Sequence, residues 1–387
     1  MGRPLTVIVL TFSIRPVRGR IENVIPYGRQ CIDEDDIAAV VATLRSDWLT
    51  CGPAVERFET ALRAYTGATH AVAFANGTAA LHGAMAAAGV GPGDRVLTSP
   101  LSFVASANCA RFVGAGVGFV DVDPKTLNLD PGRVGACDAL VAVHYAGLPC
   151  ELQSLNIRPR VIIEDAAHAL GAHTTDGPVG NCARSDLCTF SFHPVKAVTT
   201  GEGGAVTTNS DALAAVLRRF RSHGTVAKPE QGGWYYEVET LAYNYRLTDV
   251  QAALGASQMT KLDRFVALRN RLAERYGVLL AETAVELPPV APPGTLHAYH
   301  LYAVRVPNRR AVYERMRAAG IGVQVHYVPI YRHPLHASAG SPVDFPETER
   351  AYEGLLSLPL HPSLSDDDQD YVVRSLLDAL RCDPATT

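Results

Sequence analysis

A lysine in an uncharged loop is the first candidate for chemistry in this sequence. Lys196 lies in the segment SFHPVKAVTTGEGG, residues 191–204, directly after an apolar run. A lysine in such a setting can be desolvated, which lowers its pKa from about 10.4 toward the neutral amine that forms Schiff bases. The same segment also suits a phosphate-binding loop or a lysine that faces solvent. Taken alone, it leaves these alternatives open.

A carboxylate at the end of an apolar run is the second candidate. Asp165 follows the residues VIIE at 161–164. An uncompensated carboxylate at the end of a buried strand would be costly, so Asp165 needs a cationic partner. A protonated pyridine nitrogen is one such partner, because a carboxylate keeps that nitrogen protonated and lets the ring withdraw electrons. A helix N-cap or a salt bridge to Arg or Lys is the alternative.

A turn that leads into a helix is the third candidate. The segment ANGTAALH, residues 75–82, runs from an apolar stretch into an Ala-rich one. The free N–H groups at a helix N-terminus bind anions, and Thr78 adds a hydroxyl donor. The dinucleotide fingerprint G-x-G-x-x-G is absent at this turn, which argues against a nicotinamide oxidoreductase.

Alternating short apolar runs and helix-length segments must position these residues. Strands are expected at 70–74, 95–97, 117–120, 139–143, 161–163 and 187–190, and helices at 33–44 and 55–65. Apolar runs of this length are typical of a parallel sheet covered by helices on both faces. Ligands bind beyond the carboxyl ends of such strands, where all three candidate segments lie.

The pattern changes in the last third of the chain. A long helix is expected at 261–280, and a Pro-rich break follows it. Strands at 300–306 and 323–327, a helix at 310–319 and a closing helix at 366–380 with Ser365 as N-cap then predict a smaller α+β domain. The expected organisation is an extension at 1–24, a large domain at 25–260 and a small domain at 261–387.

Composition excludes several classes of function. The 35 basic and 39 acidic side chains give a net charge of −4, which offers no footprint for nucleic acid. No apolar run reaches the roughly 20 residues that span a bilayer. The eight cysteines contain no C-x-x-C pair and are expected to be reduced thiols in a cytoplasmic protein. Residues 1–24 are Arg-rich and are expected to be disordered, although a transit peptide is an alternative.

The three candidate segments together supply a phosphate cradle, a carboxylate for a ring nitrogen and an imine-forming lysine, which are the parts of a pyridoxal phosphate site. With them, the sequence resembles the DegT/DnrJ/EryC1/StrS sugar aminotransferases of fold type I. The resemblance covers about residues 25–380. Four stretches carry it: NGTAALHGA at 76–84, EDAAHALGA at 164–172, FSFHPVKAVTTGEGG at 190–204 and NYRLTDVQAALG at 244–255.

The resemblance implies an α/β fold, in which a mainly parallel central sheet is flanked by helices and followed by a smaller C-terminal α+β domain. It implies that Lys196 holds the coenzyme covalently and later moves a proton between coenzyme and substrate. It also implies that Asp165 pairs with the ring nitrogen and that Phe103 stacks on the ring. The phosphate is expected to bind to Thr78, Ser191 and the backbone of Gly77 and Ala79.

The resemblance implies further roles around the site. Asn244 is expected to reach the phosphate in a neighbouring subunit, which implies a homodimer with shared active sites. His168 either assists near the ring oxygen or is a core histidine, and Glu202 either orients the site or is structural. Three residues are expected to bind substrate, with structural roles as the alternative for the last two: Tyr245, Arg246 and His326. Metal-ligand spacing such as H-E-x-x-H is missing, so no metal is expected.

Within the family, four stretches resemble enzymes that aminate C4 of a UDP-linked 4-keto-6-deoxy-N-acetylhexosamine in pseudaminic acid synthesis. They are YGRQCIDEDDI at 27, SDWLTCGP at 46, SFHPVK at 191 and GIGVQVHYVPI at 320. The expected substrates are therefore a UDP-keto-sugar and L-glutamate. A C3 or C4 aminotransferase for a dTDP-keto-deoxysugar and a non-catalytic coenzyme-binding regulator remain alternatives. Family dehydratases carry His in place of the lysine, and Lys196 argues against that activity.

Overall fold

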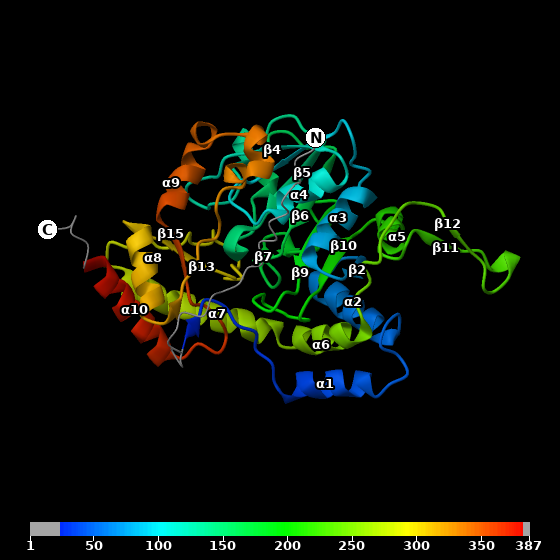
Figure 1. The fold of residues 1–387 in the computed structure, drawn as a ribbon, viewed down its shortest axis with the longest axis horizontal. Coiled ribbons are helices and arrows are strands. Elements are labelled where there is room, and N and C mark those ends of the chain that lie inside the picture. The colour runs from blue at the N-terminus through cyan, green and yellow to red at the C-terminus, as the bar shows by residue number, and fades with distance from the viewer. Residues whose placement is uncertain (1–23, 382–387) are drawn as a thin grey trace, which may run out of the picture.

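A seven-stranded sheet lies in the middle of the chain (Figure 1). The computed structural model describes residues 24–381. In sheet order the strands are β2 (His70–Phe74), β10 (Gly204–Thr208), β9 (Leu187–Ser191), β6 (Val161–Asp165), β5 (Ala139–Val143), β3 (Arg95–Thr98) and β4 (Gly116–Phe119). Strand β10 runs antiparallel to both neighbours, and the other six share one direction. The predicted α/β class with a mainly parallel sheet is confirmed.

Helices cover both faces of the sheet. One face packs against α3 (Gly77–Ala87), α4 (Ala105–Phe112) and α5 (Asp211–Phe220), and the opposite face packs against α2 (Pro53–Thr66) and α6 (Asp249–Met259). Helix α1 (Glu34–Leu44) lies on α6 and begins with a capping box between Asp33 and Asp36. Period-two alternation sends Val72 and Phe74 to the first face and Ala71 and Ala73 to the second.

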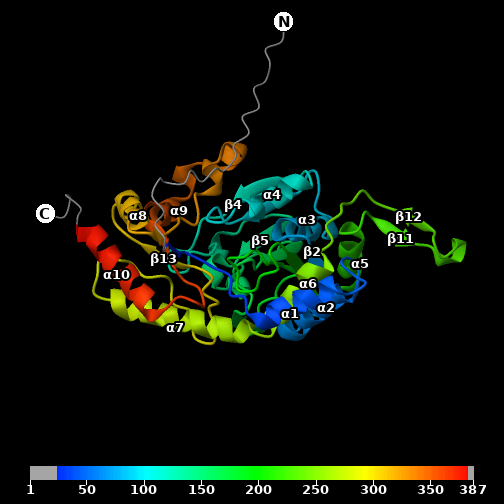
Figure 2. The ribbon, with the colours of Figure 1, turned by 60° about the horizontal axis from the view of Figure 1, so that its bottom comes forward.

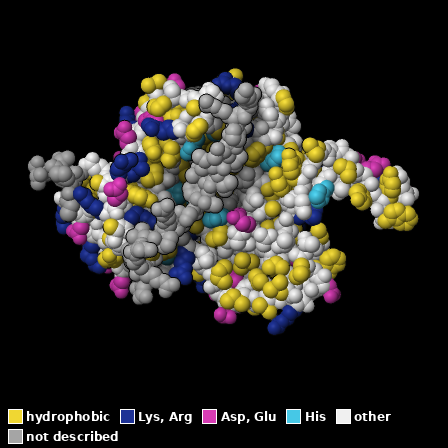
Figure 3. Space-filling view, viewed as in Figure 1, with side chains coloured by type: hydrophobic (Ala, Val, Ile, Leu, Met, Phe, Trp, Pro, Cys, Tyr) yellow, Lys and Arg dark blue, Asp and Glu magenta, His cyan; other side chains and the backbone are white. Residues whose placement is uncertain are grey.

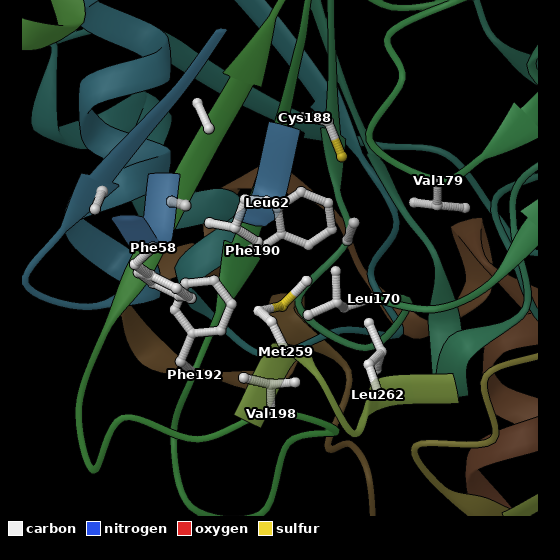
Figure 4. Packing of buried hydrophobic residues seen from close by; sticks show 14 of the residues in the cluster. Phe58, Leu62, Leu170, Val179, Cys188, Phe190, Phe192, Val198, Met259 and Leu262 are labelled. Carbon is white, nitrogen blue, oxygen red and sulfur yellow. The ribbon is translucent and has the colours of Figure 1, made fainter. Parts of the chain in front are cut away.

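Aromatic side chains fill the core between α2, α6 and the sheet (Figure 4). Phe58 and Phe192 pack edge to face with ring centroids 5.0 Å apart. Phe190 and Met259 complete the contact, and all four are buried. Phe192 directly precedes the loop of Lys196, so this packing fixes the start of that loop.

The C-terminal part has a separate core that β13 (Tyr302–Arg305) and β15 (Leu355–Leu358) share with helices. Its other elements are α7 (Leu262–Leu280), α8 (Arg309–Ala318), β14 (Ile321–Gly322), α9 (Pro346–Gly354) and α10 (Asp366–Arg381). Strand β1 (Ile25–Pro26) pairs in parallel with β14, so residues expected in the large domain contact the C-terminal part. The domain boundary at residue 260 stays a prediction.

Two expectations about strands need correction. Residues 323–327 do not form the expected strand. Gln324 alone makes an isolated bridge, to Ser357, while His326 is buried beside a cavity. The alternation of Val323-Gln324-Val325 imitates a strand, but within this segment the bridge is limited to Gln324, which exchanges two backbone hydrogen bonds with Ser357. Conversely, β10 was not predicted, because its small and hydroxyl-bearing residues give a weak apolar signal.

Two short hairpins complete the described strands. One joins β7 (His173–Thr174) to β8 (Gly177–Pro178), and the other joins β11 (Thr225–Ala227) to β12 (Tyr236–Val238). Figure 2 shows the β11–β12 hairpin standing away from the body. Trp234 on this hairpin is 82% exposed.

Exposed apolar side chains also gather along α1, at the bottom of the view in Figure 3. None of the described helices is long and apolar enough to cross a membrane. Within residues 24–381 no group of side chains could hold a metal ion, and the cysteines there are free thiols. The expected extension at 1–24 lies, except for Val24, outside the described residues.

Candidate functional site

A cavity of about 900 Å³ lies at the carboxyl ends of the parallel strands. Its wall includes Val143 at the end of β5, Asp165 at the end of β6 and Ser191 at the end of β9. Asn76 and Gly77 follow β2 and also line it. The parallel sheet therefore delivers residues from distant segments to one edge, as expected for a ligand site of an α/β fold.

Lys196 lines this cavity from the loop between β9 and β10. Hydrogen bonds close the loop on Phe192, whose carbonyl accepts from the Thr200 N–H at 3.0 Å and from the Thr199 hydroxyl at 3.1 Å. Burial lowers the pKa of Lys196 to about 8, and Asp165 opposes that shift. The ammonium thus loses its proton far more readily than an ordinary lysine does.

The chain has only four lysines, and Lys196 differs from two others in charge environment. A hydrogen bond to Glu239 raises the pKa of Lys228. At Lys261 burial lowers the pKa, but hydrogen bonds to Asp33 and Asp36 outweigh burial and raise it. Lys196 has no carboxylate within salt-bridge distance among residues 24–381. Its amine is therefore the one prepared to act as a nucleophile.

Asp165 is buried at the floor of the cavity, at 5% exposure. Its Oδ2 accepts a hydrogen bond from the Ser106 hydroxyl at 2.7 Å, and its Oδ1 accepts from the Ala167 N–H at 3.2 Å. Within the described part of the chain it makes no salt bridge and caps no helix. A carboxylate in this position suits a cation that enters the cavity.

The N-terminus of α3 points an uncapped pair of N–H groups at the site. The Asn76 side chain accepts from the Ala79 N–H at 2.8 Å, which leaves the N–H groups of Gly77 and Thr78 without a partner among the described residues. A Cβ on Gly77 would lie 2.8 Å from the Ser191 Cβ, so only glycine permits this approach. Thr78 and Ser191 line the same cavity, and together these groups can hold a phosphate.

Rings surround the remaining wall of the cavity. Phe103 lines it at 56% exposure, with its ring centroid 6.0 Å from that of Tyr327. The Tyr327 hydroxyl lies 3.0 Å from His168 Nε2, and His168 Nδ1 is buried without a hydrogen-bond partner in the described chain. An unpartnered buried nitrogen beside a cavity is available to a bound group.

His326 also faces the cavity, and its Nδ1 lies 2.9 Å from the Ser357 hydroxyl. Burial, together with repulsion by Lys196, lowers the pKa of His326 to about 4. The same causes lower the pKa of His168. Both imidazoles are consequently neutral near pH 7. Glu202 lines the cavity as an exposed residue.

The structure does not bring every expected residue into the cavity. Tyr245 lines it, but Asn244 and Arg246 do not. Asn244 forms an isolated bridge with Ser222, and Arg246 lines a second cavity of about 540 Å³ with Arg63, Arg218 and Arg221. In a single chain, two of the residues expected at the coenzyme or substrate therefore lie elsewhere.

Sequence reasoning missed several residues of the site. Tyr327 and Tyr243 line the cavity, and Ser106 contacts Asp165. Ser102 precedes α4 and Ser106 lies in its first turn, and their hydroxyl oxygens are 2.8 Å apart. Tyr243 and Tyr245 stack at 4.8 Å, and no local pattern predicts that contact.

Comparison with known proteins gives consistent matches along nearly the whole chain. The DegT/DnrJ/EryC1/StrS aminotransferase family matches residues 30–377. The spore coat polysaccharide biosynthesis protein SpsC of Bacillus subtilis is 36% identical over 380 residues, covering 92% of this chain and 97% of SpsC.

Two solved structures are also similar. The PLP form of the putative sugar aminotransferase Spr1654 from Streptococcus pneumoniae matches with a TM-score of 0.85 at 28% identity, over 93% of this chain and 99% of the other. Helicobacter pylori PseC, an aminotransferase involved in the biosynthesis of pseudoaminic acid, matches with a TM-score of 0.83 at 29% identity, over 93% and 100% of the two chains.

Proposed function

The chain belongs to the DegT/DnrJ/EryC1/StrS aminotransferase family and is a PLP-dependent sugar aminotransferase, and from this premise we propose its substrates. The proposed reaction transfers an amino group from L-glutamate to C4 of a UDP-linked 4-keto-6-deoxy-N-acetylhexosamine. The convergence of Lys196, Asp165 and the first N–H groups of α3, those of Gly77 and Thr78, on one cavity carries the proposal. The likeness to PseC over 93% of the chain supports the choice of sugar.

The residues present fit pyridoxal phosphate. Among the described residues Asp165 forms no salt bridge, so its buried carboxylate can pair with a ring nitrogen. The N–H groups of Gly77 and Thr78 have no partner there and can bind a phosphate. Ser191 stands against Gly77 and can add a hydroxyl. When bound, the coenzyme supplies an aldehyde that accepts and returns the amino group, and a ring that withdraws electrons from the reacting carbon.

The protein's own groups divide the remaining work. Lys196 binds the coenzyme, and its Nζ, once free, takes a proton from one carbon and returns it to another as general base and acid. A pKa near 8 suits this role, because both protonation states of the amine are populated near neutral pH. Asp165 would hold the ring nitrogen in its protonated form, and Phe103, which also lines the cavity, would contact the ring. His168, held by the Tyr327 hydroxyl, keeps one nitrogen for the coenzyme.

A second copy of the chain would complete the site. Asn244 and Arg246 lie outside the cavity of their own chain, and we assign them to the site of a partner in a homodimer. Exposed apolar side chains on α1 and on the β11–β12 hairpin support such an interface, since large apolar patches mark contact surfaces.

The test is a panel of nucleotide sugars. The purified protein with PLP and L-glutamate is offered UDP- and dTDP-linked 4-keto and 3-keto deoxysugars, and products are identified by mass spectrometry and NMR. We expect the UDP-linked 4-keto-6-deoxy-N-acetylhexosamine to gain an amine at C4. Preferential amination of a dTDP-sugar, or at C3, would replace the proposed substrate. Failure with every sugar, despite bound coenzyme, would favour a regulator.

A further inference from the structure

A buried serine hydroxyl that does not line the cavity contacts Asp165. Ser106 lies in the first turn of α4, is 1% exposed, and does not line the cavity. Its Oγ is 2.7 Å from Asp165 Oδ2, a contact between two buried side chains. Such a hydrogen bond to a charged acceptor is roughly twice as strong as a neutral one.

The direction of this hydrogen bond follows from the groups around it. A carboxylate can only accept, so the hydroxyl of Ser106 donates its single hydrogen to Asp165. The Phe103 carbonyl is also an acceptor within reach, but it is neutral and lies farther away at 3.2 Å. The Ser102 hydroxyl lies 2.8 Å from Ser106 Oγ and can donate to it in turn. Two hydroxyls thus form a chain that ends on the carboxylate.

The other carboxylate oxygen is also held. Asp165 Oδ1 accepts from the N–H of Ala167, so one hydroxyl and one backbone group together fix the plane of the carboxylate. A hydrogen bond to the charged form stabilises that form. A carboxylate stabilised in this way competes less strongly for a proton that it shares with a cationic nitrogen.

We propose that Ser106 is a positioning residue that orients the Asp165 carboxylate and keeps the shared proton on the ring nitrogen of the coenzyme. This inference rests on the proposed pairing of Asp165 with that nitrogen. Without the hydroxyl, the carboxylate loses its strongest donor, and the shared proton moves toward Asp165. The ring then withdraws electrons less strongly, and the coenzyme is held less tightly.

A matched control is available at Ser185, whose hydroxyl binds the residue that precedes Asp165. Glu164 precedes Asp165 on β6, and the alternation of a strand directs it to the opposite face. The Ser185 hydroxyl donates to Glu164 Oε1, and Glu164 Oε2 lies 2.7 Å from His144 Nε2. Ser185→Ala therefore removes the same kind of buried serine–carboxylate contact from the same strand, without touching the group that faces the cavity.

The experiment uses the full chain reconstituted with coenzyme that is labelled with ¹⁵N in the ring. The ¹⁵N chemical shift reports directly whether that nitrogen is protonated, and a visible titration gives the dissociation constant of the coenzyme. Wild type, Ser106→Ala, Ser106→Thr, Ser185→Ala and Asp165→Asn are compared at one pH. Thermal unfolding of the coenzyme-free proteins checks that each variant is folded.

We expect Ser106→Ala to shift the ¹⁵N signal toward that of neutral pyridine and to weaken coenzyme binding by about tenfold. Ser106→Thr keeps the hydroxyl and should restore the wild-type signal, and Ser185→Ala should match wild type. A wild-type signal in folded Ser106→Ala, or an equal change in Ser185→Ala, overturns the proposal. The role of Asp165 is read separately, because Asp165→Asn must lose the protonated signal. If Asp165→Asn keeps that signal, the proposed pairing of Asp165 with the ring nitrogen is wrong, whatever Ser106→Ala shows.

Discussion

Burial sets the charge of the groups that face the coenzyme cavity. It lowers the pKa of Lys196 to about 8 and that of His326 to about 4, and it lowers the pKa of His168 as well. Near pH 7 the imidazoles are neutral, and Lys196 is the titrating base among these three groups. The reactivity of the site should therefore follow the protonation of one side chain.

The rate of coenzyme uptake should follow Lys196. Only the neutral amine attacks an aldehyde, so the second-order rate constant for PLP binding to the coenzyme-free protein should rise with pH and level off above about 8. An ordinary lysine would reach its plateau only above about 10.4. Stopped-flow absorbance between pH 6.5 and 10 measures the midpoint. A rate that still climbs steeply at pH 10 would show that burial does not lower this pKa.

The same shift predicts a stability effect of definite sign. Because folding lowers the pKa of Lys196, the unfolded chain binds more protons between about pH 8 and 10.4, and this group's contribution to the free energy of unfolding increases with pH there. The coenzyme-free protein and its Lys196→Ala variant, unfolded with urea across this range, should differ in slope. Parallel pH dependences would contradict the expectation.

Among the elements, α2 and α6 are linked by a buried carboxylate in addition to their apolar packing. Asp249 opens α6 and is fully buried, with Oδ2 2.7 Å from the Gly52 N–H and Oδ1 2.8 Å from the Ala54 N–H. These donors lie at the N-terminus of α2, where a negative charge is favoured. Asp249 thereby ties Gly52 and Ala54 to the helix that follows the Asn244 segment.

Asp249→Ala should lower the free energy of unfolding by about 3 kcal/mol, because two buried N–H groups lose a charged acceptor. Equilibrium urea denaturation measures the change. Asp263→Asn is the control, since the Asp263 carboxylate contacts the Tyr65 hydroxyl at an exposed position and should cost no more than about 1 kcal/mol. Equal losses of unfolding free energy in the two variants would mean that the buried Asp249 contacts stabilise the fold no more than an exposed hydrogen bond does.

Elements with a strong periodic signal were predictable from the sequence. Strands β2 and β5 lie at the predicted residues because their apolar runs are continuous and bounded by turns. The segments with Lys196 and Asp165 could be placed because strand ends attract ligands. The bond between Ser106 and Asp165 joins residues 59 positions apart, and the pairing of β1 with β14 spans most of the chain. Contacts between residues so far apart in the sequence leave no local sequence pattern from which they could be predicted.

At the scale of the whole molecule, a single chain leaves several large apolar side chains exposed to solvent. On the β11–β12 hairpin Trp234 is 82% exposed, and Leu241 just beyond it is 89% exposed. On α1, Ile37 and Leu44 face solvent. Asn244 follows the hairpin in sequence and lies outside the cavity of its own chain. These features support the proposed shared-site homodimer.

Complementation between two inactive chains tests the shared site. Lys196→Ala and Asn244→Ala are each expected to be inactive. In a mixed dimer, one site has an intact lysine from one chain and an intact asparagine from the other. Random mixing of the two variants should restore about a quarter of the wild-type activity, because half of the dimers are mixed and each has one intact site. If verified heterodimers recover no activity, Asn244 does not contribute to the partner's site.

The most direct test of the account asks which amine carries the coenzyme. The protein is loaded with PLP, reduced with borohydride, digested, and mapped by mass spectrometry. The sequence has four lysines, Lys125, Lys196, Lys228 and Lys261. The mass of the modified peptide shows which of them carries the adduct. We expect one pyridoxyl adduct, at Lys196, with loss of the visible absorbance. A stoichiometric adduct at any of the other three would contradict this expectation.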